Sequence, residues 1–335
     1  GLSEIDAGKT PDATQETVKT VTLADYFFKN DYATRNDMNA EAERLMRRVF
    51  DVGVDTPRED EYGMHIAYQA SLRSACLSRQ VGAAIFSEKG VLLSTGHNDV
   101  PKFAGGLYGM EPAHNFGIVE DKRCWAFGAK CYNDEQKSEI TQLICDELKQ
   151  AELLAEENMA KARELILKSR VGQLIEFSRA VHAEMESIIS IARTASSGLV
   201  GSTLYTTTYP CHNCAKHIVD AGVTRVVYRE PYEKSLARTL HVDVIKDTSE
   251  RNLNGIVTFE TYGGVRPSRY EEFFKEQQKR KDEQGRFLDR DRERKNQNPV
   301  GASDSQLIQD SLKDLNSGVS VPFDEQNNIS AAAES

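Results

Sequence analysis

The sequence predicts an α/β fold, because short runs of strand-forming residues alternate with segments of helical periodicity. The first two runs, Val81–Phe86 and Val91–Gly96, are joined by a short turn that contains Gly90, which is typical of neighbouring strands. The second half of the chain has a regular order of expected elements: a helix from His182, a strand Thr203–Thr206, a helix His212–Ala221, a strand Arg225–Arg229, a short helix Tyr232–Leu240 and a strand Ile256–Phe259.

Two helices are expected before the first strand. Residues 36–52 have apolar side chains at roughly helical spacing, which predicts an amphipathic helix. Thr56, Pro57 and Glu59 form a capping-box pattern with proline at the first helical position, so a second helix is predicted to start there and to end near Arg79. The side chains expected to be buried on this second helix are Met64, Ala67, Ala70, Leu72 and Ala75.

The region 101–181 interrupts this order and is predicted to be an insertion. It begins with a loop that contains Gly105, Gly106 and Gly109 and continues into one long charged helix, about Asn133 to Lys168. The apolar residues of that helix predict one buried stripe, formed by Ile140, Leu143, Ile144 and Leu148. After Ser268 we expect a helix of mixed charge, which includes the basic run Lys275–Lys295, and then a disordered Gly/Ser/Asn tail.

Composition and charge narrow the functional class. The 335 residues carry a formal net charge of −10, which argues against binding to a phosphate backbone over a wide surface. No apolar run is long enough for a membrane span. Six irregularly spaced cysteines do not suggest a disulfide framework, so we expect a reducing, cytoplasmic compartment in which clustered cysteines bind metal or take part in chemistry.

Two short motifs carry the predicted chemistry. His182-Ala183-Glu184 and Pro210-Cys211-His212-Asn213-Cys214 together follow the pattern H-x-E…P-C-x-x-C. His182, Cys211 and Cys214 would give Zn²⁺ three protein ligands and leave its fourth tetrahedral position open to water, as a catalytic zinc site requires. Both motifs are predicted to open a helix, where the helix dipole favours thiolates.

Glu184 is the predicted catalytic residue. Zinc lowers the pKa of a bound water toward neutrality, and Glu184 would take its proton and hand it to the ring nitrogen and the leaving amine of the substrate. His-x-Glu alone is common, and Cys-x-x-Cys alone is more often a structural zinc knuckle or a redox pair. The two motifs together, with a strand between them, favour the catalytic interpretation.

The same residues resemble a known family. Arg73-Ser74-Ala75-Cys76, Val81-Gly82-Ala83, Gly96-His97-Asn98 and the two zinc motifs are similar to the deoxycytidylate branch of the cytidine deaminase superfamily. Leu77–Ala83, Gly105–Tyr108 and Val181–Met185 look like the bacterial anti-phage deoxycytidine nucleotide deaminases, in which a kinase-like domain precedes the deaminase. Ala24-Asp25-Tyr26-Phe27 is similar to the end of that kinase-like domain. The expected organisation is a remnant of or linker from this domain (1–55), a deaminase domain (56–265) and a C-terminal helix and tail (266–335).

The resemblance implies a cytidine deaminase-like three-layer α-β-α fold with a mixed five-stranded sheet and a helical insertion. It also implies that the chain deaminates free deoxycytidine nucleotides, dCTP or dCMP, which depletes the dCTP pool that a phage needs. Asn98 matches the residue that contacts the sugar, and the backbone of Ala183 matches the group that reads the base. Candidate phosphate contacts are Arg73, Ser78, Arg79 and Lys102, although a salt bridge on a helix surface would equally explain the arginines.

Several alternatives stay open at this point. The zinc motif also occurs in deaminases that act on a base in RNA or DNA, and its ligands alone would suit a non-enzymatic zinc-binding module. The long insertion leaves the choice between mono- and triphosphate open. His114, Cys124, Cys131 and Cys145 could bind a second zinc with Cys76, but buried free thiols are favoured. The resemblance also implies a homo-oligomer, and a nucleotide effector or an inhibitory partner is possible.

Overall fold

A computed structural model of the chain describes residues 23–29, 35–50, 54–109, 121–194, 198–250, 253–276 and 279–288. The chain divides into two compact units. The larger unit comprises residues 1–29 and 57–270, and the smaller one residues 30–56 and 271–335. His114 and the predicted C-terminal tail lie outside the described residues.

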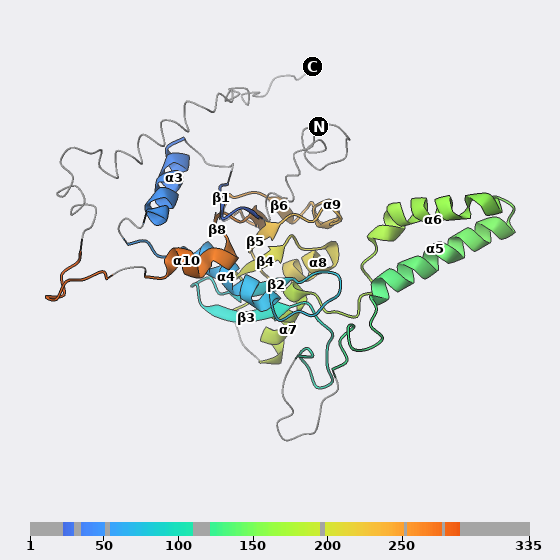
Figure 1. Cartoon of the computed structure of the whole chain (residues 1–335), viewed down its shortest axis with the longest axis horizontal. Helices are drawn as coiled ribbons and strands as arrows, with labels where there is room; N and C mark the ends of the chain where they lie inside the picture. Colours follow the sequence, from blue (N-terminus) through green and yellow to red (C-terminus); the bar gives the residue numbers. More distant parts are fainter. Residues whose placement is uncertain are drawn as a thin grey trace, which may run out of the picture. The chain divides into compact units, whose positions relative to one another are not determined.

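A six-stranded mixed sheet forms the centre of the larger unit (Figure 1). Its order is β3-β2-β4-β5-β7-β6, in which β2 is antiparallel to β3 and β4 and the remaining neighbours are parallel. The strands are β2 (Gly82–Phe86), β3 (Leu92–His97), β4 (Thr203–Thr208), β5 (Arg225–Glu230), β6 (Ile245–Asp247) and β7 (Val257–Thr261). The five predicted strands are therefore confirmed, and β6 adds a short sixth strand at one edge.

Helices cover both faces of this sheet, which gives the three layers that the resemblance implies. The alternating residues of β2 show this arrangement, because neighbouring side chains in a strand point to opposite faces. Ala83 and Ile85 pack in one apolar cluster with residues of α7 (Ala183–Arg193) and α8 (His212–Asp220). Ala84 and Phe86 belong to a second cluster with residues of α4 (Glu59–Ser71). The predicted α/β fold is confirmed.

Helix α4 differs from the prediction at both ends. Its N-cap is Arg58, whose backbone N–H donates to Oε2 of Glu61 at 2.8 Å, so the capping interaction lies beyond the predicted Thr56. The helix ends at Ser71 and not near Arg79, and Leu72 is 52% exposed although it was expected in the core. The helix is followed by a turn in which the backbone N–H of Ser74 donates to the carbonyl of Ser71 at 3.0 Å, and the hydroxyl of Ser74 donates to the backbone oxygen of Asn98 at 2.7 Å.

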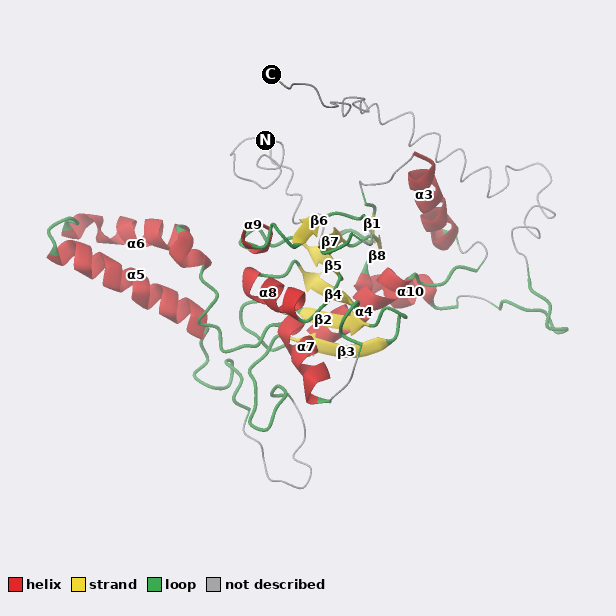
Figure 2. Ribbon diagram, turned by 180° about the vertical axis from the view of Figure 1, so that it is seen from behind, coloured by secondary structure: helices red, strands yellow, loops and turns green. Residues whose placement is uncertain are grey.

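The insertion contains two helices and not the one that was predicted. Helices α5 (Tyr132–Gln150) and α6 (Met159–Lys168) lie side by side (Figure 2). Helix α5 ends because Leu153 N–H donates to the carbonyl of Leu148 at 2.8 Å and Glu152 has a φ of +58°, a conformation typical of helix C-termini. The buried residues of α5 are Thr141 and Cys145, whereas Leu143 of the predicted stripe is 58% exposed.

The remaining strands and helices of the larger unit are short. Strand β1 (Tyr26–Phe27) pairs antiparallel with β8 (Gly264–Val265), so the segment that resembles the end of a kinase-like domain is part of the larger unit. Among the 3-10 turns are η1 (Glu156–Asn158), η2 (Arg170–Gln173) and η3 (Pro267–Arg269). Helix α9 (Ala237–Leu240) is shorter than predicted, since its first predicted residues are not helical.

The smaller unit contains the predicted amphipathic helix, α3 (Arg35–Val49). The predicted C-terminal helix is only the five-residue α10 (Tyr270–Phe274). Residues 279–288 form a turn with an isolated bridge between Lys281 and Phe287, so the solvated helix that was expected in this basic run is wrong for these residues. Within the described ranges, no helix has the length and apolar character needed to cross a bilayer.

Candidate active site

The two zinc motifs meet because each one begins a helix on the same face of the sheet. His182 is the N-cap of α7, and Cys211 is the N-cap of α8, which follows directly after β4. The sulfur of Cys211 accepts a hydrogen bond from the backbone N–H of Cys214 at 3.4 Å, which caps the helix. The first turn of α8 therefore places two sulfurs together at a helix N-terminus, where partial positive charge favours thiolates.

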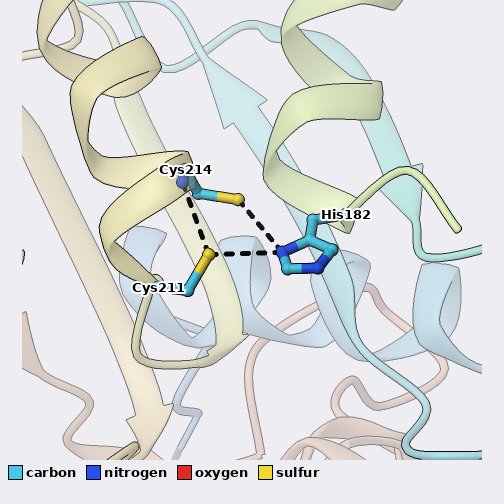
Figure 3. Close-up of side chains that lie close together, drawn as sticks. All are labelled: His182, Cys211 and Cys214. Atoms are coloured by element: carbon cyan, nitrogen blue, oxygen red, sulfur yellow. Dashed lines mark hydrogen bonds between the residues drawn. The ribbon is translucent and has the colours of Figure 1, made fainter. Parts of the chain in front are cut away.

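The three predicted ligands converge on one point (Figure 3). Nδ1 of His182 lies 3.3 Å from Sγ of Cys211 and 3.4 Å from Sγ of Cys214. One ligand atom from each of these residues lies within 4.8 Å of the others, and both cysteines are buried. Two sulfurs and one imidazole nitrogen are a donor set that zinc prefers, so these residues fit a zinc ion.

The ionisation of these groups is strongly coupled. The hydrogen bond from Cys214 is the largest cause that lowers the pKa of the Cys211 thiol. The same hydrogen bond, together with burial, raises the pKa of the Cys214 thiol. Burial disfavours the charged form of His182, but the hydrogen bond and the charge of Cys211 outweigh it and raise its pKa to about 9. Negative charge is thus concentrated on the sulfur of Cys211, which is the electrostatic environment that a divalent cation needs.

Glu184 lies beside the ligands and is not one of them. Its Oε2 is 3.6 Å from Sγ of Cys214, and the residue is only 4% exposed. Burial, followed by the negative charge of Cys211, raises the pKa of the Glu184 carboxyl to about 7. A carboxyl group with such a pKa can both accept and return a proton near neutral pH, as a general acid–base group must.

A cavity of about 990 Å³ opens onto this group. Its lining includes His182, Ala183, Glu184 and Cys211 on the zinc side. Asn98, Ser78 and Arg79, which the sequence proposed as substrate contacts, also line it. Arg73 and Lys102, the other two candidates, are not among the lining residues. The volume is at the upper end of the range that is usual for small-molecule sites.

Comparison with known proteins identifies the family. The family model described as the cytidine and deoxycytidylate deaminase zinc-binding region matches residues 57–230, which is more than half of the chain. The chain belongs to this family. It is therefore a zinc-binding hydrolytic deaminase, and His182, Cys211 and Cys214 form the group in the described residues that could hold the metal.

The chain is also similar to individual proteins. The deoxycytidylate deaminase of Enterobacteria phage T4 is 30% identical over 208 residues, which cover 57% of this chain and 90% of that protein. The phage T2 enzyme of the same name is 31% identical over 172 residues, which cover 51% of this chain and 80% of that protein. A crystal structure of the dCMP deaminase from cyanophage S-TIM5 in complex with dCMP and dUMP covers 62% of this chain and 99% of its own, with 20% identity and a TM-score of 0.33.

Asn98 is fixed firmly in the wall of the deaminase cavity. Its Oδ1 accepts from the backbone N–H of Val81 at 2.7 Å, and its Nδ2 donates to the carbonyl of Arg79 at 2.8 Å. An amide side chain has two donor hydrogens and two acceptor lone pairs, so one donor and one acceptor site remain after these bonds. Asn98 is thus a pre-oriented polar group that can still bind a ligand.

Much of the cavity is formed by residues that no sequence motif marks. Residues of the insertion, the loop after β5 and the end of β4 line it as well: Asn133, Asp134, Lys137, Leu174, Ile175, Ser178, Thr208, Tyr232, Glu233 and Lys234. No motif or spacing marks these positions, because the fold brings them to the cavity from three distant segments. The aromatic and charged residues after β5 were the only local signal, and they were interpreted as part of a helix.

The other cysteines of the deaminase are free thiols. Cys145 is fully buried in α5, as the favoured interpretation expects, whereas Cys76, Cys124 and Cys131 are only partly buried. Cys131 contacts the hydroxyl of Ser78 at 3.4 Å. In the portion of the chain that the structure describes, His182, Cys211 and Cys214 are the only metal-binding group, and His114 lies outside that portion.

Proposed function

We propose that this deaminase hydrolyses free deoxycytidine nucleotides, dCMP or dCTP, to the corresponding deoxyuridine nucleotides. The observation that carries the proposal is the cavity in which Glu184 and the zinc ligands lie together with Asn98 and three cationic side chains. The names of the phage T2 and T4 relatives point to the same substrate class. A cavity of this size suits a small nucleotide better than a base in a polynucleotide, which would need an extended basic groove.

His182, Cys211 and Cys214 would hold the zinc ion in this reaction. When bound, zinc would act as a Lewis acid that lowers the pKa of a water molecule, so that this water can lose a proton and become a nucleophile near neutral pH. Glu184 receives the proton of the attacking water on its carboxylate. It then delivers protons to the ring nitrogen and to the amine that leaves as ammonia. The buried position of Glu184 keeps bulk water away from these transfers.

The remaining wall residues would orient the nucleotide. We propose that the backbone of Ala183, which is fully buried at the start of α7, contacts the base of the nucleotide. The side chain of Asn98 is proposed to contact the sugar. Ser78 and Arg79 lie on the cavity wall and are proposed as further polar contacts. Arg73 and Lys102 stay proposed phosphate contacts on the family resemblance alone, since neither side chain lines the cavity of the single chain.

A substrate panel tests the proposed reaction. The purified chain, loaded with zinc, is incubated separately with dCMP, dCTP, CMP, deoxycytidine, single-stranded DNA and tRNA, and ammonia release is followed. We expect turnover to be fastest on a free deoxycytidine nucleotide. Faster turnover on DNA or tRNA would identify a nucleic-acid deaminase instead. Zinc binding without turnover on any substrate would indicate a non-enzymatic zinc-binding module.

We also propose a cytoplasmic role in anti-phage defence, in which the enzyme depletes the dCTP pool. The resemblance to anti-phage nucleotide deaminases, including the N-terminal segment 1–55 as a remnant of or linker from a kinase-like domain, supports this role. The test is nucleotide analysis of infected cells that express the wild-type protein or Glu184→Gln. A fall in dCTP with a rise in deoxyuridine nucleotides only in the wild-type cells is expected, and equal pools would contradict the proposal.

We further propose that the deaminase is a homo-oligomer, with a nucleotide effector or an inhibitory partner controlling it before infection. Several large apolar side chains of the insertion are exposed in the single chain, among them Leu143, Leu153 and Leu165 at 58%, 76% and 60%. Exposed apolar patches often mark subunit interfaces. Light scattering at micromolar concentration should give a mass above that of one chain, and a monomeric mass would contradict the proposal.

A further inference from the structure

The helical insertion forms one wall of the catalytic cavity. The first turns of α5 contribute Asn133, Asp134 and Lys137, and the segment that returns from α6 contributes residues between Gly172 and Ala180. These positions line the same cavity as His182, Cys211 and Glu184. A substrate bound in this cavity would therefore contact residues of the insertion.

Specific hydrogen bonds fix this wall in place. Nδ2 of Asn133 donates to the carbonyl of Leu174 at 3.0 Å, and Oδ1 of Asn133 accepts from the backbone N–H of Phe177 at 3.3 Å. The return segment is also tied to the zinc helix, since Glu176 lies 3.7 Å from Nε2 of His212. Asn133 thus anchors the start of α5 next to the metal group, and Lys137 follows one helical turn later on the same face.

Lys137 has the environment of a ligand-binding cation. Its side chain is 15% exposed, and its ammonium group contacts Oδ1 of Asp134 at 2.6 Å. That carboxylate is 64% exposed, so solvent screens much of its charge. An ammonium group has three donor hydrogens, and the bond to Asp134 uses one of them.

A second lysine lies near the same carboxylate. Lys234, from the loop after β5, also lines the cavity. The hydrogen bond from Lys137 lowers the pKa of Asp134 in opposition to burial, and the positive charge of Lys234 adds to this lowering. The charged side chains that line the cavity are thus the cations Arg79, Lys137 and Lys234 and the carboxylates Asp134, Glu184 and Glu233. Glu184 belongs to the zinc end, which leaves the cations in excess elsewhere.

We infer that Lys137 is a specificity-determining residue that binds the phosphate chain of the nucleotide substrate. This inference rests on the proposed function. A deoxycytidine nucleotide has its reacting base at one end and its phosphates at the other, so the phosphates need cations away from the zinc. A lysine ammonium is a point charge that binds phosphate without demanding a fixed orientation. The insertion would in this way select nucleotides over the nucleoside.

The alternative is that Lys137 only stabilises α5 through its pair with Asp134. Such i,i+3 pairs near a surface contribute little to stability, and their loss would not distinguish between substrates. The two roles therefore predict different kinetics. A phosphate contact changes the apparent affinity for dCMP or dCTP only, whereas a structural role changes the kinetics with deoxycytidine to the same extent.

The experiment compares Lys137→Met with Lys149→Met in the zinc-loaded chain. Lys149 is a matched control, because it lies on the same helix and pairs with Glu156 but does not line the cavity. Loss of one charge-assisted hydrogen bond should raise KM for dCMP or dCTP by about 10- to 100-fold in Lys137→Met. The kcat value, the kinetics with deoxycytidine and all parameters of Lys149→Met should stay near those of the wild type.

A further variant separates charge from structure. Asp134→Asn removes the partner of Lys137 but leaves its ammonium group in place, so KM for nucleotides should stay the same or fall. An equal rise of KM in Asp134→Asn and Lys137→Met, an unchanged KM in Lys137→Met, or an equal change with deoxycytidine would each overturn the inference.

If the wild type deaminates no cytosine nucleotide, the proposed function itself fails. A rise confined to dCTP would support the inference and place Lys137 beyond the first phosphate.

Discussion

Oε2 of Glu184 lies 3.6 Å from Sγ of Cys214, so the proposed proton carrier and a metal ligand share one buried end of the cavity. Glu184 comes from α7 and Cys214 from α8, and neither residue could reach this position if the two helices did not begin on the same face of the sheet. The separation of roles between these two residues can be tested by changing one at a time.

Glu184→Gln should keep the zinc and lose the reaction. Glutamine has nearly the same size and can still form hydrogen bonds, but it cannot accept the proton of the attacking water. General acid–base groups contribute about 10²- to 10⁴-fold to rate, and Glu184 serves several transfers, so a loss at the upper end or beyond is expected. Bound zinc, measured by atomic absorption, should equal that of the wild type. Near-normal turnover would exclude the proposed mechanism.

Cys211→Ala should lose zinc and stability together. The change removes one of the three ligands and also the sulfur that caps α8 by accepting from Cys214 N–H. Metal-binding energy is also folding energy, so the thermal midpoint should fall with the zinc content. Unfolding followed by circular dichroism, next to a zinc assay, measures both. If Glu184→Gln loses zinc as completely as Cys211→Ala does, Glu184 is part of the metal site.

The sequence was sufficient to predict the zinc group because its chemistry depends on local spacing. His182 and Glu184 lie two residues apart, Cys211 and Cys214 three apart, and each pair occupies one helix start. The strands were predicted for a similar reason, since β2 is an apolar run that can be buried on both faces and β4 consists mostly of the strand-forming residues threonine and tyrosine. Strand β6 was missed because it has three residues and pairs on one side only.

The rest of the cavity depends on tertiary contacts that sequence spacing does not reveal. Lys137 and Tyr232 line it with Asn98 although long stretches of chain separate them. Arg73 was proposed as a phosphate contact from the family resemblance alone, and it follows the end of α4 at Ser71 without lining the cavity. The turn after α4 includes a hydrogen bond between Ser74 and Asn98, which lie 24 residues apart.

An ion pair on the face of the sheet that does not carry the zinc ligands should make the free energy of unfolding depend on pH. Arg225 donates to Asp60 at 2.7 and 2.8 Å, and the hydroxyl of Tyr205 donates to the same carboxylate at 2.9 Å. Burial raises the pKa of Asp60, but the contacts with Arg225 outweigh it and lower the pKa from 3.8 to about 2. A lowered carboxyl pKa adds stability above the unfolded value of 3.8 that is lost as the pH falls through 2.

Asp60→Asn should therefore lower the unfolding free energy by about 2 kcal/mol at pH 7, since one pKa unit corresponds to about 1.4 kcal/mol. The difference between variant and wild type should shrink between pH 4 and pH 2. Urea unfolding of both proteins at each pH measures it, and effects of acid that both proteins share cancel in the difference. Glu164→Gln, in an exposed pair with Lys168, is the control and should change nothing measurable. A difference that stays constant with pH would contradict the assignment.

Two glycines allow helices to approach the sheet closely, and only one of these helices carries the site. A Cβ on Gly96 would lie 2.1 Å from the carbonyl oxygen of Ala183 and 2.6 Å from the backbone nitrogen of Ser187, both in α7. A Cβ on Gly82 would lie 2.0 Å from the carbonyl oxygen of Ala67 in α4. These are backbone atoms, so a helix must move in either alanine variant.

Gly96→Ala and Gly82→Ala should each destabilise the fold by about 1–3 kcal/mol, as overpacking of a close contact does. Their effects on activity should differ. Gly96→Ala displaces the start of α7, which holds His182 and Glu184, and a shift of about 1 Å can cost about 100-fold in rate. Gly82→Ala displaces α4, which has no proposed site residue, so kcat per bound zinc should stay near the wild-type value.

Urea unfolding and kcat per zinc at a temperature where both variants are folded provide the comparison. Wild-type kcat in Gly96→Ala, or an equal loss in both variants, would show that the position of α7 does not control the reaction.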